Sequence, residues 1–77
     1  MKKLLEFIVN KLTGHKDIEI VEKKEGDNIY LEILCEPEYI GLIIGKGGNT
    51  IKAIQNVLRI RARLENVMVF VNVSEIK

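Results

Sequence analysis

The residues of this sequence best suited to chemistry are Gly45, Lys46, Gly47 and Gly48, which stand between two apolar stretches. Glycine adopts positive φ without strain and lets another backbone come close. Lys46 supplies a compact positive charge, and a helix that begins directly afterwards offers its first N–H groups to an anion. These four residues, called the Gly loop below, therefore predict a binding site for a partner that carries phosphate.

Two common nucleotide-binding motifs do not fit the spacing of the Gly loop. A P-loop requires Gly-x-x-x-x-Gly-Lys followed by Ser or Thr, whereas Gly41 and Gly45 are one residue too close together and Gly47 follows Lys46. A dinucleotide fingerprint requires Gly-x-Gly-x-x-Gly directly after a strand, but Thr50 stands at its third glycine position. A small nucleotide-binding protein or enzyme is therefore the weakest of the functional interpretations.

The periodicity of the chain predicts the elements that position this loop. Apolar residues recur with a helical period over residues 4–12, and Gly14 follows as a helix-ending glycine. The period changes to two from about residue 16, and again over residues 29–36 and 67–73, as in half-buried strands. Turn-forming residues at 25–28 separate the first two strands. Residues 37–44 and 49–64 read as a short helix and a longer one on either side of the Gly loop.

The predicted order is therefore α-β-β-α-α-β. The second and third strands flank a two-helix crossover, which favours a parallel pair between them. We expect an α+β fold in which a three-stranded mixed sheet is covered on one face by three helices. A chain of 77 residues has room for one such core, so residues 1–77 are expected to form a single domain.

In this setting the sequence resembles the KH domain, whose Gly-x-x-Gly loop lies between two helices and clamps the backbone of a single strand. The match runs over residues 43–54, where two isoleucines precede the loop and Ile51 and Ile54 follow it, and the β-α-α-β core covers residues 29–73. The preceding helix and strand are typical of the type II form, and the whole chain is similar to small bacterial single-KH-domain RNA-binding proteins, the KhpA-like family.

The resemblance implies a groove for single-stranded RNA, lined by Gly41, Ile44, Gly45, Lys46, Gly47, Gly48 and Ile51. Gly41 would let a base or ribose approach the short helix, and the two isoleucines would face the bases. Asn49, at the start of the longer helix, with Lys52 and Arg59 beyond it, completes the predicted RNA site. The competing interpretation is that the glycines only form a tight turn between two helices, although such a turn needs one or two of them.

The charge distribution is uneven although the net charge is only +1. No acidic residue lies between Tyr39 and Leu64, a segment that holds five of the twelve basic residues, so the rest of the chain carries a net charge of −4. On a helical wheel Lys52, Asn56, Arg59 and Arg63 share one face, called the basic stripe below. Such a face suits a polyanion, although an ordinary solvated helix face has the same composition.

A second apolar row on helix 49–64 exceeds what packing on the sheet requires. Ile51, Ile54, Leu58 and Ala62 form the row expected to face the sheet, and Ala53, Val57, Ile60 and Leu64 form the other, called the outer apolar stripe below. Either the N-terminal helix or another chain covers it, and we favour a partner, as a homodimer or as a heterodimer with another KH protein. A protein-interaction module of KH shape is accordingly the alternative function.

The composition of the chain bears on catalysis, metal binding and localisation. One Cys and one His, Cys35 and His15, provide neither a disulfide nor a metal site, so no metal, cofactor or catalytic group is expected and the protein is predicted not to be an enzyme. No signal peptide or membrane span is expected, which predicts a cytoplasmic protein. The RNA interpretation predicts an RNA chaperone or a post-transcriptional regulator, with single-stranded DNA not excluded as a ligand. Tyr30, Leu34, Met68 and Phe70 are expected on the open face of the sheet.

Overall fold

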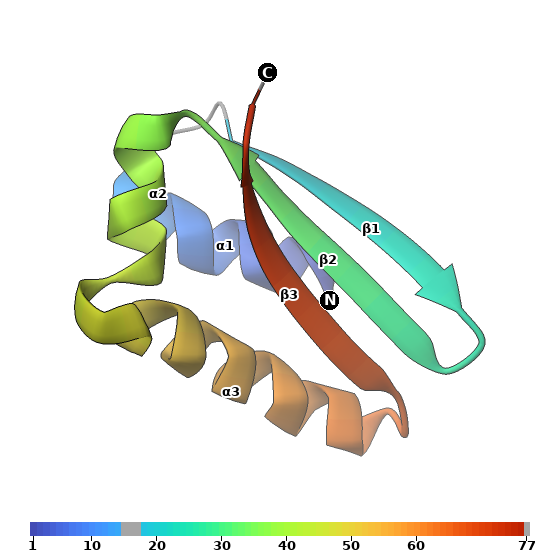
Figure 1. Cartoon of the computed structure of the whole chain (residues 1–77). Helices are drawn as coiled ribbons and strands as arrows, with labels where there is room; N and C mark the ends of the chain where they lie inside the picture. Colours follow the sequence, from blue (N-terminus) through green and yellow to red (C-terminus); the bar gives the residue numbers. More distant parts are fainter. Residues whose placement is uncertain (15–17, 77) are drawn as a thin grey trace.

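The computed structural model describes residues 1–14 and 18–76. Along the chain come helix α1 (Lys2–Thr13), strands β1 (Glu19–Glu25) and β2 (Asn28–Cys35), helix α2 (Pro37–Ile44), the 3-10 turn η1 (Lys46–Gly48), helix α3 (Asn49–Leu64) and strand β3 (Met68–Glu75) (Figure 1). The predicted α-β-β-α-α-β order is confirmed. Within the described residues, no helix combines the length and the apolar character that crossing a membrane requires.

The sheet has the order β1-β2-β3, so β3 forms one edge. β1 and β2 pair antiparallel, with Glu25 opposite Asn28 across a tight turn. β2 and β3 pair in parallel, and the Met68 N–H donates to the Asp27 carbonyl oxygen at 2.8 Å where β3 enters the sheet. The parallel pair confirms the crossover prediction, because the chain between these strands contains α2 and α3.

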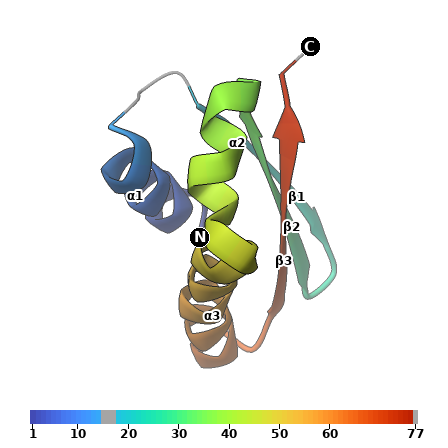
Figure 2. The ribbon, with the colours of Figure 1, turned by 60° about the vertical axis from the view of Figure 1, so that its left-hand side comes forward.

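The core lies between the sheet and the three helices, which all cover the same face of the sheet (Figure 2). Alternate residues of β2 (Ile29, Leu31, Ile33 and Cys35) are buried, as their period of two predicts. The helices contribute buried residues at helical spacing: Leu5 and Val9 from α1, Ile43 from α2, and Ile54, Leu58 and Ala62 from α3. The other face of the sheet has no helix over it (Figure 2).

The boundaries differ from the sequence-based ones by one to three residues. β1 begins at Glu19, so Ile18 precedes the strand, and β3 begins at Met68 instead of residue 67. The expectations for residues 15–17, including a surface position for His15, lie outside the described residues. Leu12 was expected on the buried face of α1 but is exposed, because it lies in the last turn of the helix, just before Gly14.

Candidate nucleic-acid interface

The Gly loop joins α2 to α3 through a backbone path that requires glycine at its first position. Gly45 has φ 75° and ψ 172°, a conformation that is essentially restricted to glycine. Its N–H donates to the Gly41 carbonyl oxygen at 2.8 Å and so ends α2. A Cβ atom at position 45 would lie 2.6 Å from Thr50 Cβ and 2.9 Å from Thr50 N. Gly45 is therefore needed for α2 and α3 to meet.

At Gly47 and Gly48 only the backbone conformation favours glycine. Gly47 has φ 65° and Gly48 has φ 77°, yet apart from its chain neighbours no described atom lies within 4 Å of a Cβ atom at either position. The positive φ values therefore explain these two glycines as turn residues, in agreement with the tight-turn interpretation. The open space above them also leaves their backbone accessible to a ligand.

Gly41 is the glycine that the fold does not explain. It lies inside α2, is exposed and has no positive φ, and apart from its chain neighbours and the α2 backbone no described atom lies within 4 Å of a Cβ atom there. Glycine inside a helix costs about 0.5–1 kcal/mol relative to alanine. Within the described residues no contact or dihedral angle offsets this cost, so the fold itself does not account for Gly41.

Two exposed lysines and the N-terminus of α3 lie beside the loop glycines. α3 begins at Asn49, whose own N–H donates to the Lys46 carbonyl oxygen. No side chain caps the N-terminus of α3, and such helix ends favour anions. Lys46 and Lys52 are exposed. Neither Lys forms an ion pair with a residue that the structure describes. Their charges are therefore available to an external anion.

The basic stripe continues this surface along α3. Lys52, Asn56, Arg59 and Arg63 are all exposed, whereas Ile54, Leu58 and Ala62 are buried on the side that faces the sheet. Arg61 lies outside the stripe and donates to the Glu65 carboxylate at 2.9 Å. α3 thus directs Lys52, Arg59 and Arg63 away from the core, and none of them pairs with an acidic side chain in the described part of the chain.

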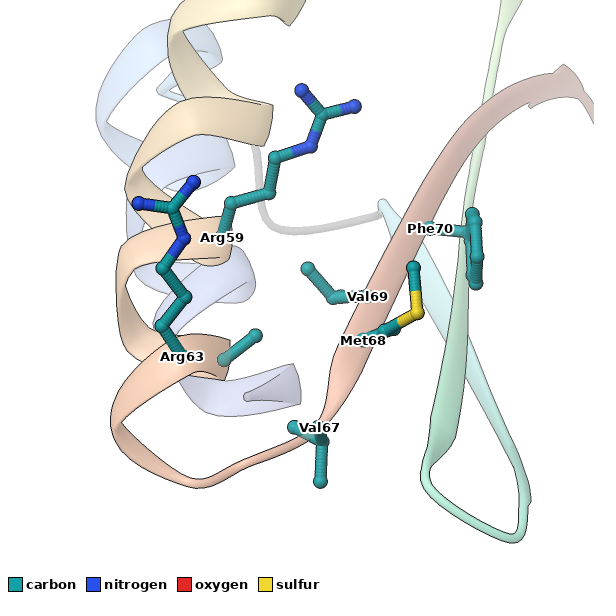
Figure 3. A pocket seen from close by; sticks show the side chains of 7 residues that line it. Arg59, Arg63, Val67, Met68, Val69 and Phe70 are labelled. Atoms are coloured by element: carbon teal, nitrogen blue, oxygen red, sulfur yellow. The ribbon is translucent and has the colours of Figure 1, made fainter.

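Between α3 and β3 lies a hollow of about 290 Å³, called the α3–β3 hollow below. Arg59 and Arg63 border it from α3, while Met68 and Phe70 border it from β3 (Figure 3). Further along the same edge, Gln55 Nε2 donates to the Val71 carbonyl oxygen at 3.5 Å. The outer edge of β3, which has no further strand beside it, therefore faces the polar side of α3.

The structure brings most of the predicted RNA-site residues together. Gly41, Ile44, the Gly loop, Asn49 and Lys52 lie along one continuous stretch from α2 to the first turn of α3. Ile44 is partly exposed, at 36%, whereas Ile51 packs against the core and offers a ligand less surface than expected. Arg59 lies well apart from the loop, about 15 Å further along α3 at 1.5 Å per residue.

Sequence reasoning named no residue of β3 as part of this surface. Arg63 was recognised as part of the basic stripe but not as a site residue, and Phe70 was assigned only to the open face of the sheet. The α3–β3 hollow brings them together. The alternation of β3 correctly separates Phe70 from the core, but no signal in the sequence shows that this edge strand runs beside the arginines of α3.

The N-terminal helix borders the outer apolar stripe but leaves all four of its residues exposed. Ala53 and Val57 share a hollow of about 320 Å³ with Phe7, Leu12 and other apolar residues of α1 and α3. Ile60 and Leu64 lie beyond it and are 63% and 75% exposed. Of the two explanations that the sequence left open, coverage by α1 therefore fails, because Ala53 and Val57 are exposed as well.

Groups suited to covalent or metal chemistry are not gathered at this surface. No three His, Cys, Asp or Glu side chains cluster as metal ligands among the described residues. Burial raises the pKa of the Cys35 thiol above its ordinary value, which keeps this side chain protonated and unreactive in the core. The geometry supports binding of an extended anion.

Comparison with known proteins agrees with this geometry. A family model for the KhpA/KhpB KH domain matches residues 2–73. RNA-binding protein KhpA of Clostridium acetobutylicum is 38% identical over 74 residues, which cover 95% of this chain and 99% of that protein. The KhpA proteins of Clostridium perfringens (36% over 74 residues, with 95% and 99% covered) and Chlamydia muridarum (37% over 76 residues, 97% of each chain) are similar. With its type II KH fold, the chain belongs to the KhpA/KhpB family of KH domains.

Proposed function

We propose that this protein binds single-stranded RNA, with the Gly loop against the sugar-phosphate backbone and the α2 surface around Gly41 and Ile44 against the bases. The observation that carries this proposal is the loop itself, in which open glycine backbone, Lys46 and the uncapped N-terminus of α3 lie side by side. The related KhpA proteins, which carry the name RNA-binding protein, support the same ligand.

Binding by one copy is expected to be weak and to discriminate little between bases. The loop region has no exposed aromatic side chain for stacking, and stacking supplies much of the affinity in other single-strand binders. A weak preference for particular bases suits an RNA chaperone or a post-transcriptional regulator. We propose that the protein acts in this way in the cytoplasm, without catalysing a reaction. Single-stranded DNA remains a possible ligand, because the proposed contacts do not require a 2′-hydroxyl.

The test replaces the phosphate site by two negative charges, in the double variant Lys46→Asp with Gly47→Asp. Asp tolerates the positive φ of Gly47 better than most residues, and a side chain there enters open space. The control variant Lys2→Asp with Lys3→Gln changes the net charge by the same amount at exposed positions on α1. Fluorescence anisotropy with labelled single-stranded RNA measures binding, and circular dichroism checks the fold.

We expect the loop variant to lose RNA binding by at least ten-fold while the control retains it. This corresponds to the loss of about one charge-assisted hydrogen bond, roughly 1.5–3 kcal/mol. A folded loop variant that binds RNA as well as the parent would refute the proposal.

A second function, pairing of two chains through the outer apolar stripe, is favoured by the exposure of Ile60 and Leu64. Most soluble oligomers are symmetric and contain identical chains, so the partner we propose is a second copy of this chain. Joining two weak RNA sites raises their combined affinity without any new RNA contact. A heterodimer with another KH protein would use the same stripe.

Sedimentation at micromolar concentration tests the pairing. The parent should sediment as a dimer and the double variant Ile60→Glu with Leu64→Glu as a monomer. Val21→Glu, at an exposed apolar position on β1, should sediment as the parent does. A monomeric parent would contradict pairing between identical chains and leave another KH protein as the partner to be tested.

A further inference from the structure

The face of the sheet that has no helix over it, called the open face below (Figure 2), carries a hollow of about 200 Å³ that reaches across all three strands. Its lining includes Val21 of β1, Tyr30 and Glu32 of β2, and Phe70 and Asn72 of β3. This cavity is called the open-face hollow below. None of the residues assigned above to RNA binding borders it, so its contents need an explanation of their own.

Two aromatic rings border the open-face hollow. Tyr30 and Phe70 are neighbours across the parallel pair of β2 and β3, and their rings stack with centroids 5.2 Å apart and an interplanar angle of 16°. Phe70 lies on the side of β3 away from α3 (Figure 3). The two side chains remain 38% and 43% exposed, and Val21 beside them is also exposed. Because the rings already hold each other in place, a bound group covers them with little loss of rotamer freedom.

A carboxylate without a cation lies beside these rings. Glu32 is partly buried and stands opposite Val21 and Asn72 in the register of the sheet. Its side chain forms no ion pair or hydrogen bond with a described residue. Lys23, which also borders the hollow, is already paired with Glu25 at 3.1 Å. A carboxylate among apolar groups gains most from a partner that is cationic and also donates hydrogen bonds.

The charge of the open face indicates which class of partner fits it. The register and the alternation of the strands place three acidic residues and one basic residue there: Glu19, Glu25, Glu32 and Lys23. Such a surface repels RNA and attracts a basic segment of a protein. Arginine suits the hollow best among cationic side chains, because its stem covers apolar surface while its planar guanidinium stacks on aromatic rings and binds a carboxylate through two parallel hydrogen bonds.

We propose that the open-face hollow binds an arginine side chain of another protein, presented by a basic segment with apolar neighbours. The guanidinium pairs with the Glu32 carboxylate, and the rest of the arginine side chain packs on Tyr30 and Phe70. The apolar neighbours cover Val21 and the surface around it. This contact uses the face of the sheet opposite the three helices, so it leaves the Gly loop and the basic stripe accessible, and one chain can bind RNA and a partner protein at the same time.

The experiment titrates the capped peptide acetyl-Leu-Arg-Leu-amide into isotope-labelled protein and follows the backbone amide shifts by NMR. The shifts should saturate and centre on the residues of the open-face hollow. Glu32→Gln should weaken binding about ten-fold through the loss of a charge-assisted pair, and Tyr30→Leu about two- to five-fold through the loss of a ring contact with the cation.

Two controls isolate the arginine contact. Glu19→Gln removes the same charge at an exposed position of the open face outside the hollow, and it should bind the peptide as the parent does. The same peptide with lysine in place of arginine should bind the parent about five-fold more weakly, because an ammonium group forms one of the two parallel hydrogen bonds. Circular dichroism checks that each variant is folded.

The inference holds if the peptide shifts the amides around Glu32 and Glu32→Gln weakens binding while Glu19→Gln does not. It is overturned if these amides do not shift, or if both glutamine variants and the lysine peptide give the parent affinity, since diffuse attraction between charges then accounts for the binding. It is also overturned if single-stranded RNA shifts the same amides and binds Tyr30→Leu more weakly, or if Glu32→Gln changes the sedimentation of the protein. These two results would assign the hollow to RNA and to a second copy of the chain.

Discussion

Gly41→Ala should make the protein more stable and its RNA complex weaker. Position 41 has an ordinary helical backbone inside α2, and apart from its chain neighbours and the α2 backbone no described atom lies within 4 Å of a Cβ atom there. The substitution therefore adds no clash within the chain and removes only the entropic cost of an exposed helical glycine. The added methyl group, however, points into the space where the proposed RNA ligand approaches α2.

The substitution should raise the stability of the protein and lower its affinity for RNA, and the size of each change can be estimated separately. Alanine in place of glycine inside a helix stabilises by about 0.5–1 kcal/mol, which for a domain of this size raises Tm by about 2–8 °C. A methyl group forced into a packed contact costs about 1–3 kcal/mol, so the affinity for RNA should fall about five-fold or more. A loss of binding caused by unfolding would instead lower Tm.

Thermal unfolding by circular dichroism and RNA binding by fluorescence anisotropy measure the two effects on the same samples. Asn10→Ala provides the control, since it improves helix propensity at an exposed position of α1 and should raise Tm without changing RNA affinity. Full RNA affinity in Gly41→Ala would show that the ligand does not approach α2 there, and a lowered Tm would show that the account of this helix is wrong.

Three other predictions follow from the same structure. Gly45→Ala should lower the free energy of unfolding by about 2–6 kcal/mol, because it combines a glycine-only backbone conformation with a clash against Thr50, and urea unfolding should show this. With about three cations in contact, log K for RNA should fall with log salt at a slope near −2; a slope near zero would contradict the electrostatic contribution. Burial raises the pKa of the Cys35 thiol above its ordinary value, so the unfolded chain loses its thiol proton first and the free energy of unfolding declines as pH rises through the range in which the unfolded thiol titrates; the free energy of unfolding of Cys35→Ala should decline less steeply.

The sequence determines the fold here because several local signals agree. The period of two in residues 29–35, the helical period of residues 51–62 and the glycines at the ends of α1 and α2 each specify one element, and the parallel crossover follows from their order. Boundaries were less certain, since most strand-end residues, such as Glu19, Glu25 and Met68, are exposed and no core contact marks where the strand begins or ends. Leu12 is exposed for the same reason, because apolar character alone does not specify contact at the last turn of a helix.

The sequence predicts those parts of the site whose residues are neighbours in the chain. It does not predict the part that forms between distant segments. The Gly loop and the first turn of α3 are continuous, so motif and spacing identify them. The hollow at Arg63 and Phe70 depends on how far β3 lies from α3, which is decided by the packing of Ile54, Leu58 and Ala62 on the sheet. The separate roles of the glycines also required coordinates, because only the neighbours of each Cβ position distinguish Gly45, which the fold needs, from Gly41, which it does not.

α3 carries three faces, and their order around the helix bears on whether the two proposed functions can operate together. The basic stripe borders the outer apolar stripe, since Asn56 and Ile60 are four residues apart and hence about 40° apart on the helix circumference. A partner chain seated on Ile60 and Leu64 would cover a face different from the one that carries Lys52 and Arg59, so pairing leaves the cations accessible to RNA. Loss of pairing should then weaken binding to long RNA, which can engage two copies, more than binding to a short oligonucleotide, which engages one.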